Sequence, residues 1–396
     1  MIHCAEAVLP GHPDKFCDRV ADAIVAQALA ADPAAFAQIE VGVWADQAWL
    51  SGTIVTRKPM AHTPSEILVQ AGLSIGLDAA NHIDAARYRV TDTVCQNIDD
   101  PTESRSICDD QCIVIGYAGY GRKTRYLPPE HFLVHSLVDG LWSACQAGLL
   151  KGCGPDGKVL IAMREEAKVW TLETVLVTLQ QPPGLGLMDL TQRVHECLRD
   201  CYGALQASDA RWVQHWRAVE VLVNPNGPHL RGGSDGDNGQ TGRKLVMDYY
   251  GPRVPLGGGA LAGKHPAHID RMAARAARQA AVRAVQTGAP ECTIRLACAP
   301  NRNAPLQETW EMGRRGERQG QGFFNFDAML ARLPTGLAAR DQGNGVYAWE
   351  LPEEVKPLRK RPVARHVPRN RSTAPSSESP WPHLDGNLRS AKGEAA

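Results

Sequence analysis

Residues 232–264 constrain this chain most, because they hold two glycine-rich stretches that each end in a cation. The first, residues 232–244, reads GGSDGDNGQTGRK, and the second, residues 257–264, reads GGGALAGK. Glycines let backbone N–H groups approach and turn around phosphate oxygens. Arginine then binds as a planar fork and lysine as a point charge. The two stretches together predict a polyphosphate-binding site.

Two other interpretations of these glycines stay open. Gly258 to Lys264 fits the first seven positions of the phosphate-loop pattern GxxxxGK of nucleotide hydrolases. The eighth position should be Ser or Thr, to hold Mg²⁺, but it is His265. A plain set of glycine turns without a ligand is the second interpretation. Two loops that each end in a cation are more than turns require.

A third candidate anion site lies near the N-terminus, where residues 11–15 read GHPDK. Apolar residues at three-and-four spacing after Pro13 predict a helix that ends near Asp32-Pro33. The free N–H groups and the dipole at a helix start favour an anion. His12 and Lys15 would reinforce that site, and Asp14 could take a metal that bridges to phosphate.

Each of these N-terminal residues also has a structural interpretation. His12 could be a helix cap or a surface group. Asp14, Asp18 and Asp22 recur every four residues on one stripe of the predicted helix. The first two could simply complement the helix dipole.

The rest of the chain alternates predicted strands and helices irregularly, which favours the α+β class. Strands 39–44 and 49–55 are expected to form a hairpin. The other predicted strands are 112–118, 158–163, 171–180 and 245–250, and the other predicted helices are 64–76, 129–149, 187–205 and 268–287.

The composition limits the classes of protein that this chain can belong to. Its 396 residues suggest two or three domains, and its 43% hydrophobic content can build real cores. The formal net charge is zero, so no strong field draws the whole molecule to nucleic acid or membrane. No signal peptide or apolar run of about 20 residues is visible, and the 11 cysteines form no Cys-x-x-Cys pair. We expect a soluble cytoplasmic protein with reduced thiols.

Further charged groups are candidates for the site or for the surface. The acidic candidates are Glu40, Asp110, Asp156 and Asp270. Arg271, Arg275 and Arg278 could form a solvated basic stripe on the last predicted helix. Residues 356–396 are rich in Pro, Ser and Arg, and by composition they are a disordered basic tail.

Five ordered motifs resemble those of the S-adenosylmethionine synthetases, also called methionine adenosyltransferases. GHPDK at residues 11–15 is similar to the N-terminal motif of that family, and GDNGQTGRK at 236–244 is similar to its GDxGxTGRK signature. The third motif corresponds to residues 257–264 followed by Ile269-Asp270-Arg271. Weaker matches are Asp110-Gln111 before Gly116-Tyr117-Ala118, and Pro155-Asp156-x-Lys158. Their order and spacing agree over roughly residues 1–300.

The resemblance implies three similar α/β-sandwich-type domains about a pseudo-threefold axis. We expect an N-terminal domain at 1–100, a central domain at 101–224, a C-terminal domain with the phosphate loops at 225–355, and the tail at 356–396. It also implies a homodimer or a dimer of dimers with active sites between subunits. In the implied reaction, methionine sulfur attacks C5′ of ATP, and the released triphosphate is hydrolysed to phosphate and diphosphate.

The resemblance assigns roles residue by residue. His12, Lys158, Arg243, Lys244 and Lys264 are the expected catalytic residues. The other expected ATP contacts are Asp156, His229, Asp237 and Ala260. Methionine contacts are expected from Gln96, Asp110, Asp237 and His268. Asp14 and Asp270 would ligate Mg²⁺, with two ions expected per site, and Glu40 would approach a K⁺ site.

The chain departs from the family pattern at several of these positions. Thr53 replaces a glutamate that contacts methionine, and Pro228-His229 replaces an Arg-Phe pair whose ring is expected to stack on adenine. His268 replaces a lysine, and a charge-bearing loop at 106–109 replaces a glycine-rich one. The polyphosphate half of the expected site is therefore better kept than the methionine half.

Three functions remain open from the sequence. The chain could be an active synthetase for methionine or an analogue. It could be a triphosphate hydrolase with an altered sulfur substrate, or a non-catalytic ATP-binding subunit that partners an authentic synthetase. Retention of His12 with the basic phosphate residues favours an enzyme. The changes at Thr53, Pro228 and His268 together favour the non-catalytic subunit.

Overall fold

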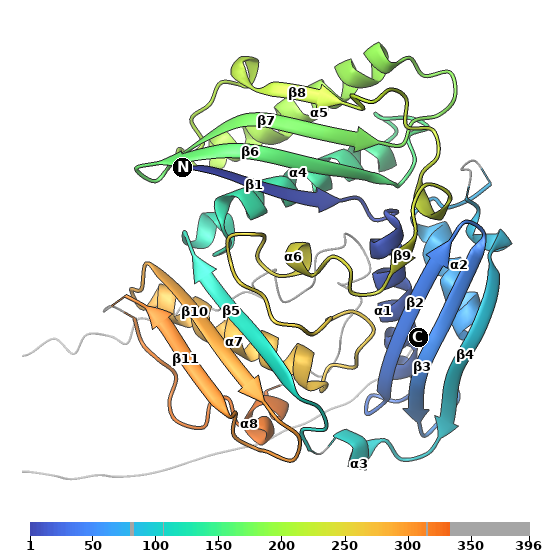
Figure 1. The fold of residues 1–396 in the computed structure, drawn as a ribbon, viewed down its shortest axis with the longest axis vertical. Helices are drawn as coiled ribbons and strands as arrows, with labels where there is room; N and C mark the ends of the chain where they lie inside the picture. Colours follow the sequence, from blue (N-terminus) through green and yellow to red (C-terminus); the bar gives the residue numbers. More distant parts are fainter. Residues whose placement is uncertain (80–82, 106, 314–315, 333–396) are drawn as a thin grey trace, which may run out of the picture. The chain divides into compact units, whose positions relative to one another are not determined.

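The computed structural model describes residues 1–79, 83–105, 107–313 and 316–332. In this part the chain forms three β-sheets with helices packed against them (Figure 1). The mixed α+β class expected from the sequence is confirmed. The expected tail at 356–396 and the end of the expected C-terminal segment lie outside the described residues.

One order of elements, helix–strand–strand–helix–strand, occurs twice and begins a third time. In the complete repeats, the last strand pairs parallel with the second strand of an antiparallel hairpin. The first repeat is α1 (Pro13–Ala31), β2 (Phe36–Trp44), β3 (Gln47–Thr56), α2 (Pro64–Ser74) and β4 (Arg89–Ile98). The second is α4 (Pro129–Gln146), β6 (Gly157–Glu166), β7 (Val169–Leu179), α5 (Leu187–Ser208) and β8 (Glu220–Val223). The described part of the third is α7 (Ile269–Gln286), β10 (Glu291–Cys298), β11 (Gln307–Met312) and α8 (Phe326–Leu330).

The first hairpin strand of every repeat takes a further antiparallel partner from elsewhere in the chain. These partners are β9 (Gly239–Gln240) on β2, β1 (Ile2–Val8) on β6, and β5 (Cys112–Gly119) on β10. The sheets are therefore β4-β3-β2-β9, β1-β6-β7-β8 and β11-β10-β5. Every sheet thus includes one strand from outside the chain segment expected for it. The expected domain boundaries and the pseudo-threefold axis stay predictions.

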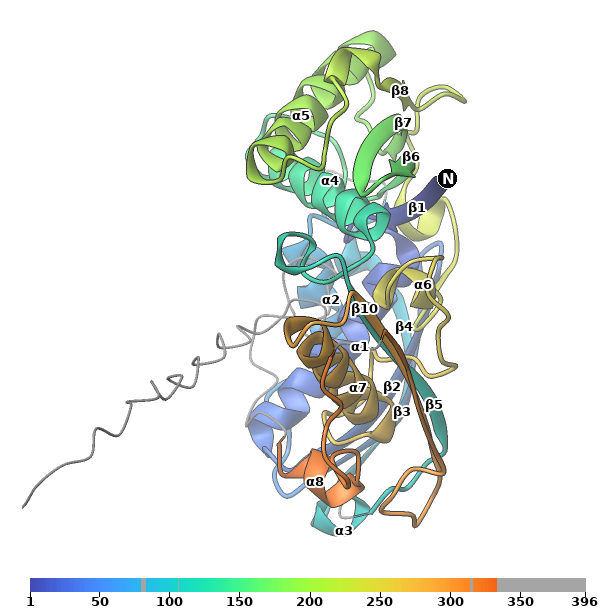
Figure 2. The same ribbon diagram turned by 90° about the vertical axis from the view of Figure 1, so that its left-hand side faces the viewer.

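Helices α1, α2, α4, α5 and α7 lie on the same side of the three sheets, and the opposite sheet faces are open (Figure 2). Strand β3 shows why, because Ala48, Leu50 and Ile54 are buried while Trp49 and Ser51 are exposed. This alternation gives one core-facing and one open face. No helix among the described residues combines the length and apolar character needed to cross a bilayer.

Helix α7 packs closely on β5 because its inward face is built of alanine. Ala273, Ala277 and Ala281 are fully buried there. The contact is tightest at Gly116 of β5, where an added Cβ would lie 2.2 Å from the backbone carbon of Ala277. A larger residue at position 116 would separate the helix from the sheet.

The expected solvated basic stripe on α7 is wrong for two of its arginines. Arg278 is buried, and its guanidinium donates to the backbone oxygens of Arg125 at 2.7 Å and Tyr126 at 3.1 Å. Arg271 donates to Lys264 O at 2.8 Å and to Asp22 Oδ1 at 2.9 Å. Periodicity shows that arginines share a helix face, but only packing shows what covers that face.

The strand expected at 245–250 is also wrong. Residues 245–248 form one helical turn, α6 (Leu245–Asp248), that begins at Lys244. Short apolar runs do not distinguish a strand from a buried helical turn. The turn directs Asp248 into the interior, where its carboxylate meets Lys15.

Lys15 is the centre of a buried ionic cluster between α1 and α6. Its ammonium lies 2.6 Å from Asp248 Oδ1 and 3.1 Å from Asp18 Oδ2. All three side chains are at least 95% buried. Burial alone would lower the pKa of Lys15, but the two carboxylates raise it above its usual range. The cluster fixes α6 against the first helix.

We expect Gly116→Ala to lower the free energy of unfolding by about 1–3 kcal/mol, because the added methyl group meets the backbone of α7. Urea unfolding measures the change. Gly203→Ala on α5 is the matched control, since nothing lies within 4 Å of its added Cβ. That control should gain up to about 1 kcal/mol from helix propensity. Equal effects of the two variants would contradict the packing at Gly116.

Lys15→Met should lower the free energy of unfolding by roughly 3 kcal/mol, because it leaves two buried carboxylates without their cation. The pKa values of the orphaned Asp18 and Asp248 would then lie above their unfolded values. A raised carboxyl pKa costs stability as pH rises, so the deficit should be larger at pH 8 than at pH 5. Urea unfolding at both pH values, with exposed Lys151→Met as control, checks this. A pH-independent deficit would contradict the assignment.

Candidate functional site

The aspartate stripe of α1 holds both glycine-rich stretches. Asp14, Asp18 and Asp22 lie one turn apart, and each accepts a backbone N–H from one of the stretches. The bonds are Gln240 N to Asp14 Oδ1 at 3.0 Å, Gly242 N to Asp18 Oδ1 at 2.8 Å, and Gly263 N to Asp22 Oδ1 at 2.9 Å. The stripe therefore does more than complement the helix dipole. It positions the two loops that the sequence marks for phosphate.

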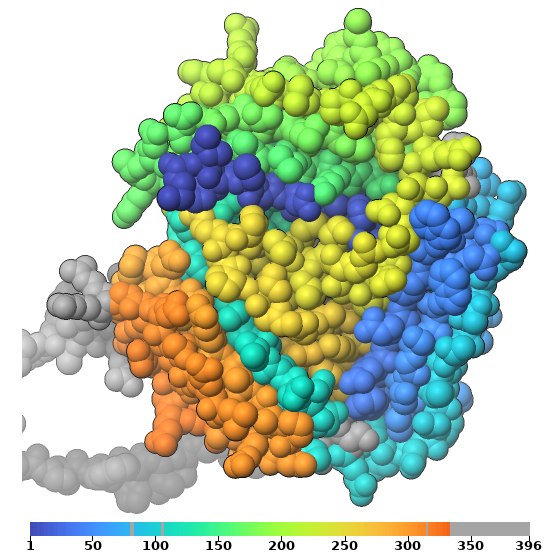
Figure 3. Space-filling view, in the orientation of Figure 1, coloured from blue at the N-terminus to red at the C-terminus, as the bar shows by residue number. Residues whose placement is uncertain are grey.

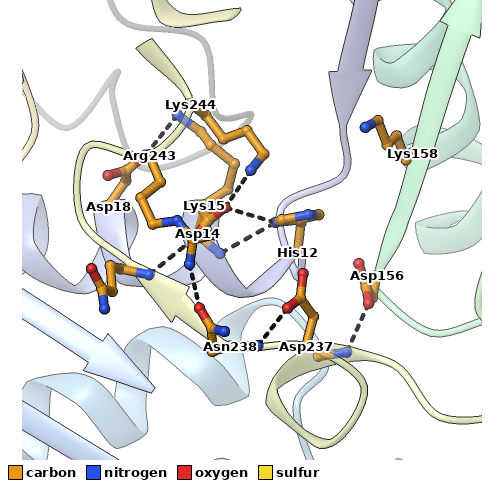
Figure 4. A network of polar contacts seen from close by, with 12 residues as sticks. His12, Asp14, Lys15, Asp18, Asp156, Lys158, Asp237, Asn238, Arg243 and Lys244 are labelled. Atoms are coloured by element: carbon orange, nitrogen blue, oxygen red, sulfur yellow. Dashed lines mark hydrogen bonds and ion pairs between the residues drawn. The ribbon is translucent and has the colours of Figure 1, made fainter. Parts of the chain in front are cut away.

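The first cluster of candidate residues surrounds Asp14 (Figure 4). The Asp14 carboxylate is 1% exposed, pairs with the ammonium of Lys244, and lies 3.6 Å from Nε of Arg243. Arg243 also donates to Asn238 Oδ1. Lys244 is mostly buried while Arg243 is 43% exposed, so both cations stand at the border between interior and solvent.

His12 is held in one tautomer by the start of α1. Its Nδ1 accepts the N–H of Asp14 at 3.2 Å, so this nitrogen carries no proton. Burial lowers the pKa of His12, which favours the neutral ring near pH 7. The single proton of a neutral imidazole must then be on Nε2. His12 can therefore donate a hydrogen bond to an oxygen in the cluster.

Candidate ATP contacts line the other side of His12. Asp156 Oδ2 accepts Gly233 N at 2.8 Å and lies 3.8 Å from Nε2 of His229. The charges of Asp156 and Asp237 both act on the pKa of His12, which places these carboxylates around the imidazole. Figure 4 shows Asp237 beside His12 and Lys158 on the neighbouring strand. Lys158 pairs there with Glu6 at 2.5 Å.

A second cluster lies at the start of α7. Asp270 is buried and pairs with Lys264 at 2.5 Å. His268 caps this helix just as His12 caps α1, because its Nδ1 accepts the N–H of Asp270 at 3.2 Å. The Nε2 of His268 is buried, has no hydrogen-bond partner among the residues that the structure describes, and lies 3.8 Å from Asp110 Oδ2. Burial lowers the pKa of His268 as well.

Ala260 and two glycines join the clusters. An added Cβ at Gly242 would lie 2.7 Å from Cβ of Ala260, and one at Gly259 would lie 2.3 Å from Oδ1 of Asp270. Gly242 precedes Arg243, and Gly259 precedes Ala260. The loop of the first cluster therefore touches the loop of the second. Figure 3 shows this segment, in yellow, filling the middle of the face between the three sheets.

Two expected site residues stand apart from the clusters in the part of the chain that the structure describes. Gln96 lies on edge strand β4, aligned with buried Ile54, so the register puts it on the helix-covered side of the sheet. Thr53 is one residue before Ile54 and belongs to the open face. No hydrogen bond or ion pair between described residues links Gln96 to either cluster. Gln96 and Thr53 therefore lie on neighbouring strands but belong to opposite faces of one sheet.

Glu40 occupies an intermediate position on β2. Its side chain is exposed. Desolvation raises the pKa of Glu40, and the charge of Lys264 opposes this shift. Glu40 is thus within the electrostatic reach of the second cluster.

Asp110, His268 and Asp270 could in principle hold a metal, since one ligand atom from each lies within 4.8 Å of the others. The cap at His268 argues against imidazole ligation, because Nδ1 is occupied and Nε2 carries the proton. Buried carboxylates without imidazole are the hard oxygen donors that suit Mg²⁺. Asp14 and Asp270, each already paired with a lysine, fit that ion.

Sequence reasoning missed two side chains that hold the cations of the expected site. Asp248 and Asn238 hold Lys15 and Arg243, and neither was singled out. The sequence offered one usable signal, the four-residue spacing of Asp14, Asp18 and Asp22. It did not show which backbone groups those carboxylates accept.

Comparison with known proteins assigns the family. The model of the S-adenosylmethionine synthetase N-terminal domain matches residues 1–98, and that of the C-terminal domain matches residues 231–318. S-adenosylmethionine synthase of Rhodospirillum centenum is 30% identical over 77% of this chain and 79% of its own length. S-adenosylmethionine synthase of Mycobacterium ulcerans is 31% identical over 76% of this chain and 79% of its own length. S-adenosylmethionine synthase 1 of Rhodospirillum rubrum is 32% identical over 76% of this chain and 78% of its own length. These matches show that the chain, with the glycine-rich loops described above, belongs to the S-adenosylmethionine synthetase family.

Proposed function

We propose that this protein is an S-adenosylmethionine synthetase that joins the adenosyl group of ATP to the sulfur of methionine or an analogue. One observation carries the proposal: His12, Arg243 and Lys244 share a cluster that contacts the loop leading to Lys264 and Asp270. Family membership makes this the first function to test. The proposed setting is the cytoplasm, in a homodimer or a dimer of dimers.

The chemistry requires alignment and a stabilised leaving group. A thioether sulfur attacks C5′ directly, so the protein supplies no nucleophile. Negative charge grows on the departing triphosphate, and fixed donors and cations lower the barrier most there. His12 Nε2–H would donate to the oxygen that leaves C5′. Lys158, Arg243, Lys244 and Lys264 would hold the phosphates.

Asp14 and Asp270 would hold Mg²⁺ once Lys244 and Lys264 turn from these carboxylates to the phosphates. Bound Mg²⁺ would neutralise charge on the phosphate oxygens. Glu40 is the proposed neighbour of K⁺. Asp156, His229, Asp237 and Ala260 would contact ATP. Gln96, Asp110, Asp237 and His268 would contact methionine. Because Gln96 lies apart within one chain, we propose that a second subunit completes the methionine site.

We further propose that the repeated order of elements reflects a pseudo-threefold arrangement of domains at 1–100, 101–224 and 225–355. The antiparallel partner that each first hairpin strand takes from another segment supports this arrangement. Exchange of strands between repeats would bind the three units into one body.

A second candidate function follows from the altered methionine half. Thr53, Pro228 and His268 each stand where the family pattern has a charged side chain. A triphosphate hydrolase with another sulfur substrate, or an ATP-binding subunit of an authentic synthetase, would tolerate these changes. Purified protein with ATP, Mg²⁺, K⁺ and methionine separates the cases. We expect sulfonium product. Release of phosphate without sulfonium product would indicate the triphosphate hydrolase. ATP binding without either product would indicate the non-catalytic subunit.

The role of His12 can be tested with His12→Asn, because asparagine can still cap α1 but lacks the distant N–H. We expect the rate of sulfonium formation to fall about 10²–10³-fold, as for loss of one preplaced donor. Hydrolysis of added tripolyphosphate has no C5′–O bond to break, so it should fall far less. Rapid-quench assays of both reactions measure the difference. Equal losses would contradict the assigned role.

Thr53→Glu should restore recognition of the substrate ammonium. One charge-assisted hydrogen bond is worth about 1.5–3 kcal/mol, so KM for methionine should fall roughly tenfold or more with little change in kcat. Thr53→Gln matches the size without the charge and is the control. If glutamine lowers KM as much as glutamate does, or neither changes it, position 53 does not read the ammonium of methionine.

A further inference from the structure

Two cysteines face each other at the end of the β5–β10 ladder. Cys112 begins β5 and Cys298 ends β10, and they are direct partners in the antiparallel register. Each is 8% exposed. They are described as free thiols, 186 residues apart in the sequence and brought together only by the sheet.

The backbone geometry of this pair is suitable for a disulfide. Directly opposed residues of an antiparallel pair have Cα atoms about 4.5–5.5 Å apart, and disulfides span about 4.4–6.8 Å. The two side chains are also close enough for each thiol to shift the pKa of the other.

We propose that Cys112 and Cys298 form a reversible disulfide in the presence of a small-molecule disulfide oxidant. One of the two cysteines, as its thiolate, attacks the oxidant and releases one small thiolate, which leaves a mixed disulfide. The other cysteine then attacks the sulfur of the first and releases the second small thiolate. The protein loses two electrons and two protons, and the oxidant gains them as two thiols.

The bond would fix the corner of the molecule that carries Asp110. Cys112 follows this aspartate by two residues, and the Cys108 thiol donates to Asp110 O at 3.2 Å. Cys108 O in turn accepts Asn301 N–H at 2.8 Å, from the turn after β10. A covalent link between β5 and β10 would therefore tie the Asp110 loop to that turn. Any effect on activity rests on the proposed function, whereas formation of the bond does not.

Other described cysteines are less suited to bridging. Cys292 lies on the same strand, but its ladder partner is Ala118. Cys197 and Cys201 lie one turn apart on α5, where a bridge would distort the helix. Cys108 is the main competitor, because the charge of Cys298 contributes to the raised pKa of the Cys108 thiol after burial.

The test treats the full chain with glutathione disulfide, blocks remaining thiols, and maps linked peptides by mass spectrometry. We expect one peptide pair that joins Cys112 to Cys298, reversed by dithiothreitol. Cys298→Ser should abolish the link, and Cys292→Ser, a buried cysteine on the same strand, should keep it. No link, or a link of Cys108 to either cysteine in the wild type, would overturn the proposal.

Two further measurements keep the test independent of the function. The linked wild type should unfold at higher urea concentration than its reduced form, whereas Cys298→Ser should show no oxidant-dependent shift. An unchanged urea midpoint in a fully linked sample would show that the bond strains the ladder and would count against the proposal. If no synthetase activity exists at all, the peptide map still decides the disulfide. If the map shows no link, the activity of the reduced enzyme is unaffected.

Discussion

The structure depends on carboxylates of α1 that accept backbone N–H groups from distant loops. A glycine-rich segment cannot hold one shape by its own side chains, because it has almost none and loses much conformational entropy on folding. Asp14, Asp18 and Asp22 supply the missing constraint through charge-assisted hydrogen bonds. Each bond is made to a partly or fully buried carboxylate. The glycine-rich loops are thus held in one shape by the protein itself, which would lower the cost of ordering them when a ligand binds.

The segment from residue 244 to residue 264 supplies a cation to the first helix of every repeat. Each of these helices has an acid at its second position, and each acid is paired with a cation from residues 244–264. The pairs are Asp14 with Lys244, Glu130 with Arg253, and Asp270 with Lys264. An acid near a helix start is favoured by the dipole, and a cation then compensates its burial. The segment therefore runs between the sheets and meets each repeat in turn (Figure 1).

The three ion pairs differ in whether their cation could also bind another anion. Arg253 donates two hydrogen bonds of 2.7 Å to the Glu130 carboxylate and also forms an ion pair with Glu165. This pair is therefore closed, with both carboxylate oxygens of Glu130 bound, and its role is structural. Lys244 and Lys264 each make a single ion pair to an aspartate and can be drawn to a stronger anion. His12 and His268 cap only these two helices, and both rings hold their proton on the outer nitrogen. The residues proposed for catalysis thus lie at the two repeats whose first helix has a histidine cap and a lysine partner.

Much of this could be predicted from the amino-acid sequence. Periodicity and capping placed α1, the β2–β3 hairpin and α7 within a few residues, because these elements follow from local apolar spacing and helix-start chemistry. The motifs at 11–15 and 236–244 gave the family, which the comparisons confirm. The error at 245–250 arose because a short apolar run has no periodicity of its own, and only contact with Lys15 decides its shape.

Tertiary structure alone decided which distant groups meet. No local rule pairs β1 with β6 or β5 with β10, since strand partners across more than a hundred residues are chosen by the packing of whole sheets. The burial of Arg278, the cluster of Lys15 with Asp248, and the facing thiols of Cys112 and Cys298 follow from those pairings. The sequence determined the chemical groups and the local elements, because both depend on neighbours along the chain. The contacts of those groups depend on neighbours in space, which only the folded chain defines.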